Sequence, residues 1–428
     1  MSIYYIDTEN GNNLNDGCSA SKPIADINAI SIRPGDTILF KRGSFVRGML
    51  KNVSGSEGMP VTYGAYGEGK KPVFCGSVDV GDSKIWVEER KNIWACTVAD
   101  DETGNFVFNN GNEYGTFRWS FEELQNQGDF YDNRAGYREL KKKLGSEHKI
   151  YLYSDGNPGE YYDNIECVIY GNRTLAYSGH DMIFEELRFI NSGVHAIAGE
   201  GKSRNITIRN CEFENIGGCV WDAENKVRFG NGVEFWNAAE NIGIFGCVFN
   251  NIYDSAVTHQ GGDECEPASN MIFKNNIFIK CGMAAYEQRD VFPKYAEFSS
   301  NICIDAGEGF SKQGEIMPRS SEIWPQPMGH HVFLWRINRA AENGEMIISD
   351  NKFLNAPYGA AIYSIISPDA EKQIKIFGNI YYTEAEDLLN RIYGKNYKDF
   401  NEYSKEEASV RYISQSEYKR IKEDTYKL

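Results

Sequence analysis

Three acidic residues in the middle of the chain have the surroundings that acid–base chemistry needs. Glu234 lies between a valine and an aromatic pair in a short strand-like segment. Asp254 stands in a turn, and Glu287 follows Tyr286 in a second strand-like segment. Two carboxylates facing one groove are what cleavage of a glycosidic bond uses, because one protonates the departing oxygen and the other attacks the sugar or activates water. These three residues are therefore the candidate catalytic carboxylates.

Polar and aromatic residues on neighbouring segments would assist them. Since side chains alternate along a strand, an inward valine and phenylalanine on either side of Glu234 leave Glu234 and Trp236 outside. His259 joins this outer set only if Thr258 faces the core, and a shift of one residue would bury the whole set. We expect His259 and Arg289 to orient the carboxylates and tryptophans to hold a sugar ring. The predicted set is His259 for catalysis and Trp236, Arg289, Lys312, Trp335 and His331 for substrate binding.

Each candidate also has a purely structural interpretation. Glu234 fits a solvated strand residue, and Glu287 fits an exposed charged edge. Asp254 is of a type that forms turns through a side-chain bond to the backbone. A lone histidine on a strand, such as His259, is frequently structural. The sequence alone leaves these alternatives open.

No cofactor is predicted. A loop with Asp263, Glu264 and Glu266 offers oxygen ligands for Ca²⁺, but it lacks the spacing of a calcium loop, so a solvated acidic loop is favoured. The sequence has no G-x-G-x-x-G opening a helix, no Walker loop, no G-x-S-x-G and no zinc signature.

A loosely repeating segment must position the candidates. Its aligned positions are Phe213, Phe249, Phe278, Cys303 and Phe353, at intervals of 36, 29, 25 and 50 residues by subtraction of residue numbers, and the last interval equals two steps of 25. Such a period, with short alternating strands, predicts coils of a parallel β-helix. Stacked coils place equivalent residues about 4.8 Å apart in rows, so that acids far apart in sequence share one groove.

Two further sets of residues recur in this repeat. Asparagines 210, 276, 301 and 351 are predicted to form an internal ladder that bonds to the turn backbones. Cys211, Cys247 and Cys303 occupy similar places, which favours a stack of small apolar side chains over disulfides. The ten cysteines contain no Cys-x-x-Cys pair.

The chain divides into four predicted parts. Residues 1–75 form an N-terminal cap and the first coils, with a short amphipathic helix over 21–30. Residues 76–178 break the repeat and are interpreted as a β-rich insertion. Residues 179–382 are the regular coils with the substrate groove, including a long loop over 312–329 that covers one face. Residues 383–428 form a helical C-terminal cap, in which Thr383 and Glu386 match a capping box.

Composition narrows the classes of partner. The net charge of −16 weighs against nucleic acid or an anionic membrane, and the 13% aromatic content suits sugar binding. No segment approaches the roughly 20 apolar residues of a membrane span. The start Met1-Ser-Ile-Tyr-Tyr lacks the features of a signal peptide, so a cytoplasmic location is expected; a leader removed from a longer protein would instead mean secretion. The oligomeric state stays open.

The chain resembles the right-handed parallel β-helix proteins that act on carbohydrates, the pectate-lyase-like superfamily, over nearly its whole length. The resemblance rests on Tyr4-Tyr-Ile-Asp-Thr-Glu-Asn-Gly, Pro34-Gly-Asp-Thr-Ile-Leu-Phe, Arg228-Phe-Gly-Asn-Gly-Val-Glu-Phe-Trp and Tyr253-Asp-Ser-Ala-Val-Thr-His-Gln-Gly. Residues around Asn92-Ile-Trp and Ile150-Tyr-Leu-Tyr-Ser resemble the insertion of β-helix glycosidases of the β-xylosidase and lacto-N-biosidase type. In those proteins carboxylates on neighbouring coils do the chemistry, which maps onto Glu234, Asp254 and Glu287.

The sequence therefore predicts an all-β chain, a single-stranded right-handed parallel β-helix with an N-terminal helical cap, a β-rich insertion and a C-terminal helical tail. The leading hypothesis is a glycoside hydrolase that acts on oligo- or polysaccharide. The first alternative is a polysaccharide lyase or uronate epimerase with Lys312, Arg289 or His259 in the chemistry. The second alternative is a glycan-binding β-helix without activity. The sugar, the linkage and the stereochemical outcome stay open.

Overall fold

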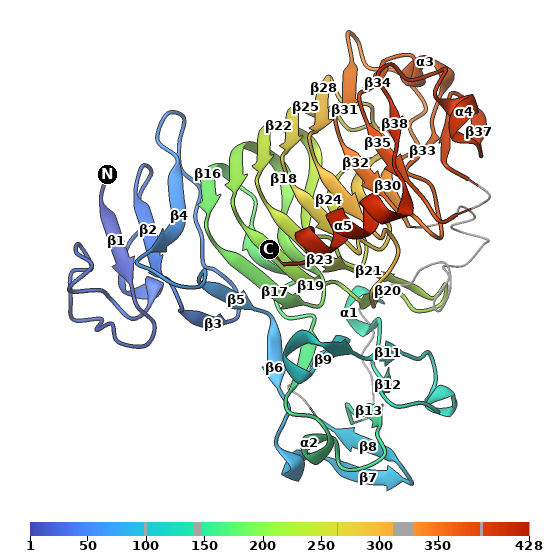
Figure 1. Cartoon of the computed structure of the whole chain (residues 1–428). Helices are drawn as coiled ribbons and strands as arrows, with labels where there is room; N and C mark the ends of the chain where they lie inside the picture. The colour runs from blue at the N-terminus through green and yellow to red at the C-terminus, as the bar shows by residue number, and fades with distance from the viewer. Residues whose placement is uncertain (98–100, 141–146, 263, 311–328, 386–387, 428) are drawn as a thin grey trace.

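The computed structural model describes residues 1–97, 101–140, 147–262, 264–310, 329–385 and 388–427. The chain winds into successive coils whose strands stack side by side, with a separate lobe from the first half of the chain beneath them (Figure 1). The long parallel sheets are those expected of a β-helix. Each coil contributes one strand to each of three parallel faces, because alternating apolar side chains turn one side of every strand inward.

The first face carries the candidate groove. Its strands pair in parallel, and two of them, β18 and β22, bend and continue into the second face. In chain order they are β15 (Thr174–Tyr177), β18 (His195–Arg209), β22 (Val233–Phe245), β24 (Ser255–Gln260), β27 (Ala284–Arg289), β30 (His330–Trp335), β33 (Ile362–Ile365) and β36 (Asn390–Ile392).

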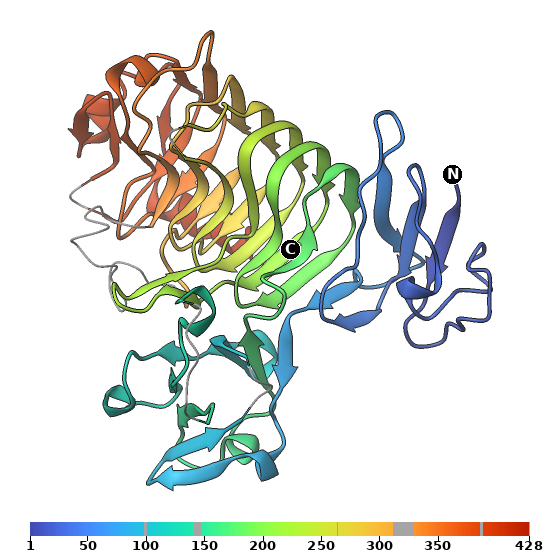
Figure 2. The ribbon, with the colours of Figure 1, turned by 180° about the vertical axis from the view of Figure 1, so that it is seen from behind.

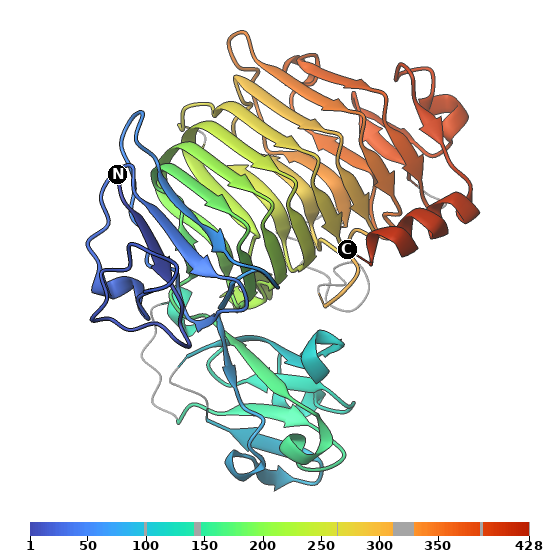
Figure 3. The ribbon, with the colours of Figure 1, turned by 60° about the vertical axis from the view of Figure 1, so that its left-hand side comes forward.

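The second face begins near the N-terminus. It starts with β1 (Ile3–Ile6), β2 (Thr37–Lys41), β4 (Val61–Tyr66) and β16 (His180–Glu185), and the far halves of β18 and β22 follow. It ends with β25 (Ser269–Lys274), β28 (Tyr295–Ser299), β31 (Glu345–Ser349) and β34 (Ile374–Phe377). Figure 3 shows these strands lying side by side from the first coils to the last.

The third face is a parallel sheet of ten strands among the described residues. They are β3 (Phe45–Arg47), β5 (Val73–Cys75), β17 (Arg188–Ser192), β19 (Glu212–Ile216), β23 (Val248–Ile252), β26 (Ile277–Ile279), β29 (Ile302–Ile304), β32 (Lys352–Leu354), β35 (Ile380–Tyr382) and β38 (Arg411–Tyr412). Its inward side chains close the core that the other two faces share.

The predicted repeat alignment is confirmed by the register of the third face. Phe213, Phe249 and Phe278 pair in turn, and Phe278 pairs with Cys303. Neighbouring rings stack with centroids 4.5 and 5.1 Å apart. Cys303 pairs directly with Phe353, so the interval of 50 residues is one coil and the prediction of two coils is wrong. The extra length belongs to the connection that contains residues 311–328.

A buried asparagine ladder runs beside this row. The Oδ1 atoms of Asn301, Asn351 and Asn379 each accept a hydrogen bond from the backbone N–H of the preceding ladder residue, at 2.9 to 3.0 Å. Asn276, Asn301 and Asn351 are members, as predicted, and the ladder ends on the carboxylate of Glu407. Asn210 is not a member, because it is exposed and has a positive φ of 52° in the turn one residue earlier.

The cysteine prediction is correct in part. All ten cysteines are free, and the backbone N–H of Cys211 lies 3.4 Å from the Sγ atom of Cys247. These two cysteines occupy the asparagine ladder position of their coils, since the backbone N–H of Cys247 donates to Asn276. Cys303 instead takes the place of a phenylalanine in the stacked row, so the prediction that it stacks with Cys211 and Cys247 is wrong.

Residues 77–169 supply two small, largely antiparallel sheets that form the lobe seen below the coils in Figure 2. One sheet contains β6 (Ser77–Asp79), β9 (Thr103–Phe108), β10 (Glu113–Tyr114) and β14 (Ile165–Ile169). The other contains β7 (Val87–Arg90), β8 (Ile93–Cys96), β11 (Thr116–Phe117), β12 (Asp129–Asp132) and β13 (Ile150–Tyr153). The lobe meets the coils through Tyr114, whose ring lies 6.1 Å from that of Phe310.

Helices at the two ends differ from the prediction. A single 3-10 turn, Ile27–Ala29, replaces the helix expected over 21–30, because the preceding Ile24 is held by a parallel bridge to Ile6. The helix expected from Thr383 is also wrong: the Thr383 hydroxyl accepts from the N–H of Ala385 in a local turn, and residues 390–392 form strand β36.

The C-terminal tail is helical. Its last helix, α5 (Gln415–Thr425), begins at the capping residue Ser414 and lies along the edge of the C-terminal coils in Figure 3. Tyr418 packs in a cluster with Ile304, Leu354 and Tyr382 on the outside of the third face. None of the described helices is long and apolar enough to cross a bilayer.

Candidate active site

A row of outward side chains on the first face brings the candidate acids together. Ala198 pairs with Glu234, Glu234 with Thr258, and Thr258 with Glu287. The row is fixed by its inward neighbours, because Val233 and Phe235 on β22 are fully buried in the core, as Tyr286 is on β27. Glu234 and Glu287 therefore point away from the core, and their backbones lie two strand spacings apart, about 9.6 Å.

The carboxylate of Glu234 is held by three neutral donors. Asn231 Nδ2 donates to Oε2 at 2.5 Å, and Gln260 Nε2 donates to the same oxygen at 2.8 Å. The indole N–H of Trp236 donates to Oε1. The residue is only 5% exposed, yet it lines a cavity on each side. Glu234 is thus fixed in orientation and open to a ligand.

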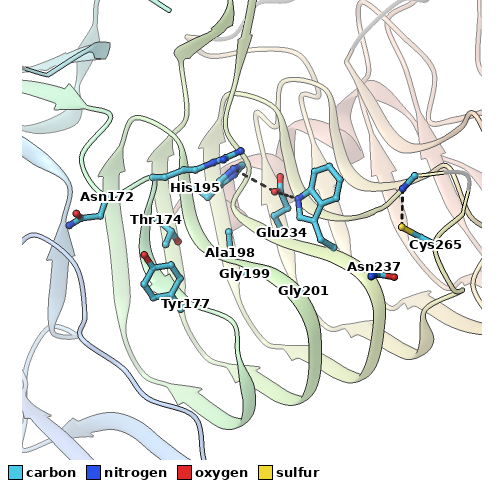
Figure 4. A pocket seen from close by; sticks show the side chains of 13 residues that line it. Asn172, Thr174, Tyr177, His195, Ala198, Gly199, Gly201, Glu234, Asn237 and Cys265 are labelled. Atoms are coloured by element: carbon cyan, nitrogen blue, oxygen red, sulfur yellow. Dashed lines mark hydrogen bonds and ion pairs between the residues drawn. The ribbon is translucent and has the colours of Figure 1, made fainter. Parts of the chain in front are cut away.

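His195 faces Glu234 from the preceding coil (Figure 4). Its Nε2 atom lies 3.6 Å from Glu234 Oε1 and has no hydrogen-bond partner. Its Nδ1 atom accepts the backbone N–H of Asn231 at 3.1 Å, so the proton of the neutral ring sits on Nε2. Burial lowers the pKa of His195 despite the nearby carboxylate. The ring is therefore a neutral donor directed at the candidate acid.

Glu287 is held by a different pair of donors. Trp335 Nε1 donates to Oε1 at 2.7 Å, and Ser255 Oγ donates to Oε2 at 3.0 Å. The Trp335 ring stacks on Phe333 and is approached by the guanidinium of Arg289, at 5.4 Å. Trp335 is 4% exposed, so the prediction that it offers a sugar platform is wrong. Its role here is to orient Glu287.

A cluster of opposite charges lies beside Glu287. Asp290 is flanked by Arg289 and Arg336, whose Nε atoms lie 3.4 and 3.1 Å from its carboxylate oxygens. Burial raises the pKa of Asp290, and the two arginines oppose that effect. The two guanidinium groups are thus balanced by the carboxylates of Asp290 and the neighbouring Glu287.

Two cavities meet at Glu234. The charged cavity, of about 370 Å³, is lined by Asp254, Glu287, Arg289, Asp290 and Arg336 among others. The apolar cavity, of about 560 Å³, is lined by Asn172, Thr174, Tyr177, Ala198, Gly199 and Gly201 among others. Both cavities include Arg173, His195, Glu234, Trp236 and Gly262. Together they form one groove with Glu234 at its centre.

The predictions for two histidines are wrong. His259 pairs with Phe235 and Gln288 on the inward row, where Gln288 Nε2 donates to its Nδ1 at 2.9 Å. Burial lowers its pKa to about 4, so it is neutral and away from the groove. His331 stacks on the core ring of Phe353 at 5.6 Å, and burial lowers its pKa to about 3.

The remaining candidates divide between the groove and undescribed parts of the chain. Asp254 lines the charged cavity, and its backbone N–H donates to the carbonyl oxygen of Gly230 on the preceding coil at 3.1 Å. Lys312, the loop predicted over 312–329 and Asp263 lie outside the described residues, apart from position 329. Glu264 is exposed, and Glu266 lies 3.5 Å from Lys202. The described residues contain no group of three His, Cys, Asp or Glu arranged for a metal.

Sequence reasoning missed several groove residues. His195 was not predicted because it lies one coil before the acids, in a segment without their flanking aromatics. The alignment of Ile197 with Val233 would have found it, since this alignment puts His195 beside Asn231. Asn231, Gln260 and Tyr177 were missed because only their neighbours in space reveal their role.

Neither a family model nor a curated protein matches the chain. Among solved structures it is similar to XylC in complex with xylose, with a TM-score of 0.55 and 13% identity over 96% of this chain and 68% of that one. It is similar to the pectate lyase Pel9A, with a TM-score of 0.50 and 13% identity over 97% and 78%. The chain has the β-helix fold of carbohydrate-active enzymes.

Another similar structure is the GH136 lacto-N-biosidase from Eubacterium ramulus, with a TM-score of 0.47 and 14% identity over 97% of this chain and 67% of that one. At these identities the similarity concerns the fold, and the chemistry must be argued from the groove itself.

Proposed function

We propose that the chain is a glycoside hydrolase in which Glu234 and Glu287 are the catalytic pair. One observation carries this proposal: both carboxylates line the charged cavity from one outward row, two strand spacings apart. A cavity of about 370 Å³ falls within the range of small-ligand sites. Two carboxylates flanking a sugar-sized space are the minimum apparatus for glycosidic cleavage.

The spacing favours a single displacement. In inverting enzymes the two carboxyl groups stand about 6.5–9.5 Å apart, which leaves room for a water, whereas retaining enzymes need about 5–5.5 Å. The backbones of Glu234 and Glu287 lie about 9.6 Å apart, so carboxyl groups that extend outward in parallel would stand near the upper end of the first range. One carboxylic acid then protonates the glycosidic oxygen as its bond to the anomeric carbon breaks. The other carboxylate takes a proton from the water that attacks that carbon from the opposite face.

The neighbouring side chains supply orientation and binding. Trp236 is half-buried and lines both cavities, so it can face a sugar ring while its N–H holds Glu234. Arg289 lines the charged cavity and is directed by Asp290, which suits it to bind hydroxyl groups of the substrate. Asp254 is a third carboxylate in the same cavity, available to bind a sugar hydroxyl.

The test uses isosteric substitutions and a substrate panel. Glu234→Gln and Glu287→Gln should each lower hydrolysis of oligosaccharides by about 10² to 10⁴-fold, the range that acid–base groups contribute. Glu240→Gln is the matched control, because Glu240 lies on the same strand as Glu234 but is exposed on another face. Full activity in both active-site variants, with a wild-type enzyme that cleaves the panel, would disprove the assignment.

The structure weakens the lyase or epimerase alternative, because His259, one of its predicted bases, does not face the groove. His259 lies in the core, so it cannot reach a sugar proton, and Arg289 is held between Asp290 and Trp335. A lyase would release an unsaturated product that absorbs in the ultraviolet. Product absorbance on uronate polymers, with no release of reducing sugar from neutral oligosaccharides, would favour this alternative instead.

A further inference from the structure

We propose that the apolar cavity is the subsite for the departing group and that Glu234 is the acid which protonates it. This assignment rests on the proposed hydrolase function and gives each half of the groove a role. The departing group would be a sugar or aryl ring with an apolar face. Three features of the groove lead to it: the sharing of Glu234, the lining of the cavity, and the order of residues along the outward row.

Glu234 is shared between the cavities and Glu287 is not. Glu234 lines both, whereas Glu287 lines the charged cavity alone. The general acid of a glycosidase must contact the oxygen that joins the transferred sugar to the departing group. The base contacts only the water on the far side of the transferred sugar. A carboxylate at the junction of two cavities therefore fits the acid, and a carboxylate inside one cavity fits the base.

The two cavities differ in chemistry in the way this assignment requires. The charged cavity holds carboxylates and guanidinium groups together, among them Asp254, Glu287 and Arg289, which can bind the hydroxyls of a sugar and face the charge that develops on it during the reaction. The apolar cavity is lined mostly by small or uncharged residues such as Ala198, with Arg173 and Glu234 at the part it shares with the charged cavity, and Glu234 is the one carboxylate among the lining residues that the structure describes. A surface of this kind favours a departing group that leaves as a neutral alcohol, because its oxygen takes up the proton as the bond breaks.

The order of residues along the outward row also places the departing group on the side of Glu234 that faces the earlier coils. Tyr177 pairs with Ala198, and Ala198 pairs with Glu234, so Tyr177 lies two strand spacings before the acid. Glu287 lies two spacings after it. The substrate would thus extend along the stacked coils, with the scissile bond at Glu234. Tyr177 is 49% exposed, which leaves surface for its ring to contact the departing ring.

The neutral His195 belongs to this junction. It lines both cavities, and its Nε2–H points at Oε1 of Glu234 from 3.6 Å. A neutral donor at that position stabilises the carboxylate that is left once Glu234 has given its proton to the departing oxygen. His195 therefore acts as a positioning residue for the acid.

The first experiment separates the acid from the base by changing the departing group. Fluoride leaves without protonation, so a glycosyl fluoride needs the base but not the acid. Wild type, Glu234→Gln and Glu287→Gln are compared on an oligosaccharide that the wild type cleaves and on the glycosyl fluoride of the same sugar. Glu234→Gln should lose at least 100-fold on the oligosaccharide and less than 10-fold on the fluoride. Glu287→Gln should lose at least 100-fold on both.

The second experiment removes the proposed stacking ring. Tyr177→Ala should lower kcat/KM for the oligosaccharide by about 3- to 10-fold, the loss expected of one ring contact, and leave the fluoride within 2-fold. Ala198→Leu fills the same cavity and should show the same selectivity. Tyr161→Ala is the control, because Tyr161 is 52% exposed on the small lobe.

The outcomes distinguish the two proposals. If Glu234→Gln loses activity equally on every substrate, or if Tyr177→Ala lowers fluoride and oligosaccharide turnover alike, the subsite assignment is overturned while the hydrolase function stands. If the wild-type enzyme cleaves none of the oligosaccharides, aryl glycosides or fluorides, the proposed function itself fails and this assignment fails with it.

Discussion

The Nε2 atom of His195 lies 3.6 Å from Oε1 of Glu234, while Nδ1 of the same ring accepts the backbone N–H of Asn231. The Asn231 side chain in turn donates to Oε2 of Glu234. Two neighbouring coils are thus joined around a single carboxylate. The tautomer of His195 is set by the backbone, so the donor at Nε2 does not depend on any bound molecule.

This relationship predicts different effects for two substitutions of His195. His195→Gln keeps an amide N–H near the position of Nε2, and His195→Asn keeps only an acceptor near the position of Nδ1. We expect His195→Asn to lower kcat about tenfold or more with little change in KM, and His195→Gln to retain most of kcat, because the donor supports the acid after proton transfer. Steady-state kinetics on the cleaved oligosaccharide would measure both. Equal losses of kcat in the two variants would mean that His195 contributes by packing and not as a donor to Glu234.

The spacing of Glu234 and Glu287 predicts the stereochemistry of the product. Because a water fits between carboxylates two strand spacings apart, the first product formed should have the inverted anomeric configuration. Proton NMR recorded in the first minutes of hydrolysis, before the free sugar equilibrates, would show one anomer. A product with retained configuration would place the nucleophile closer to the anomeric carbon and would point to Asp254 in place of Glu287.

The coil architecture and the outward acids could be predicted because they depend on local patterns. The phenylalanine row repeats at intervals near one coil length, and Glu234 stands between two residues that belong in a core. Alternation along a strand then places its carboxylate outside. Glu287 follows the large apolar Tyr286 in the same way, and its outward direction is also observed.

The errors arise where alternation is interrupted. Ala256 and Val257 both face the core at the bend that begins β24, so Thr258 turns outward and His259 inward. A two-residue period applied through that bend puts His259 on the wrong side. His331 precedes the inward Val332 at a similar bend. A bend of this kind depends on contacts between coils, which single-strand patterns do not contain.

The buried His259 predicts a loss of stability in mild acid. Its pKa is about 4 in the folded chain, because burial disfavours the charged ring, against 6.5 when exposed. Below pH 6.5 the unfolded chain takes up a proton that the folded chain does not, so this contribution to stability is present above pH 6.5 and is lost as the pH falls to about 4. The loss for one such group amounts to roughly 3 kcal/mol.

Urea unfolding at pH 7 and at pH 4.5 would measure this effect. The difference in unfolding free energy between the two pH values should be smaller in His259→Gln than in wild type, since glutamine does not titrate. His180→Gln is the control, because the side chain of His180 is 37% exposed and bonded to Asp181. An unchanged difference in His259→Gln would show that another group, such as His331, carries the acid sensitivity.

The asparagine ladder predicts where the coils are most sensitive to substitution. Asn301 accepts from the backbone N–H of Asn276 at 2.9 Å and donates to the carbonyl of Phe273 and to Asn351, both at 3.0 Å. Asn301→Ala would leave these buried groups without partners, and each such group costs about 1–3 kcal/mol. We therefore expect a loss of about 2–4 kcal/mol in the free energy of unfolding.

The matched substitution for this test is Asn396→Ala on strand β37 (Lys395–Tyr397), where the side chain is exposed and the expected change is within about 0.5 kcal/mol. Urea unfolding of both variants would give the two free energies. Because coils contact mainly their neighbours, the damage in Asn301→Ala should be greatest near β26 and β29, which hydrogen exchange of the backbone amides would locate. Equal free energies of unfolding in the two variants would mean that the asparagine ladder does not stabilise the coils.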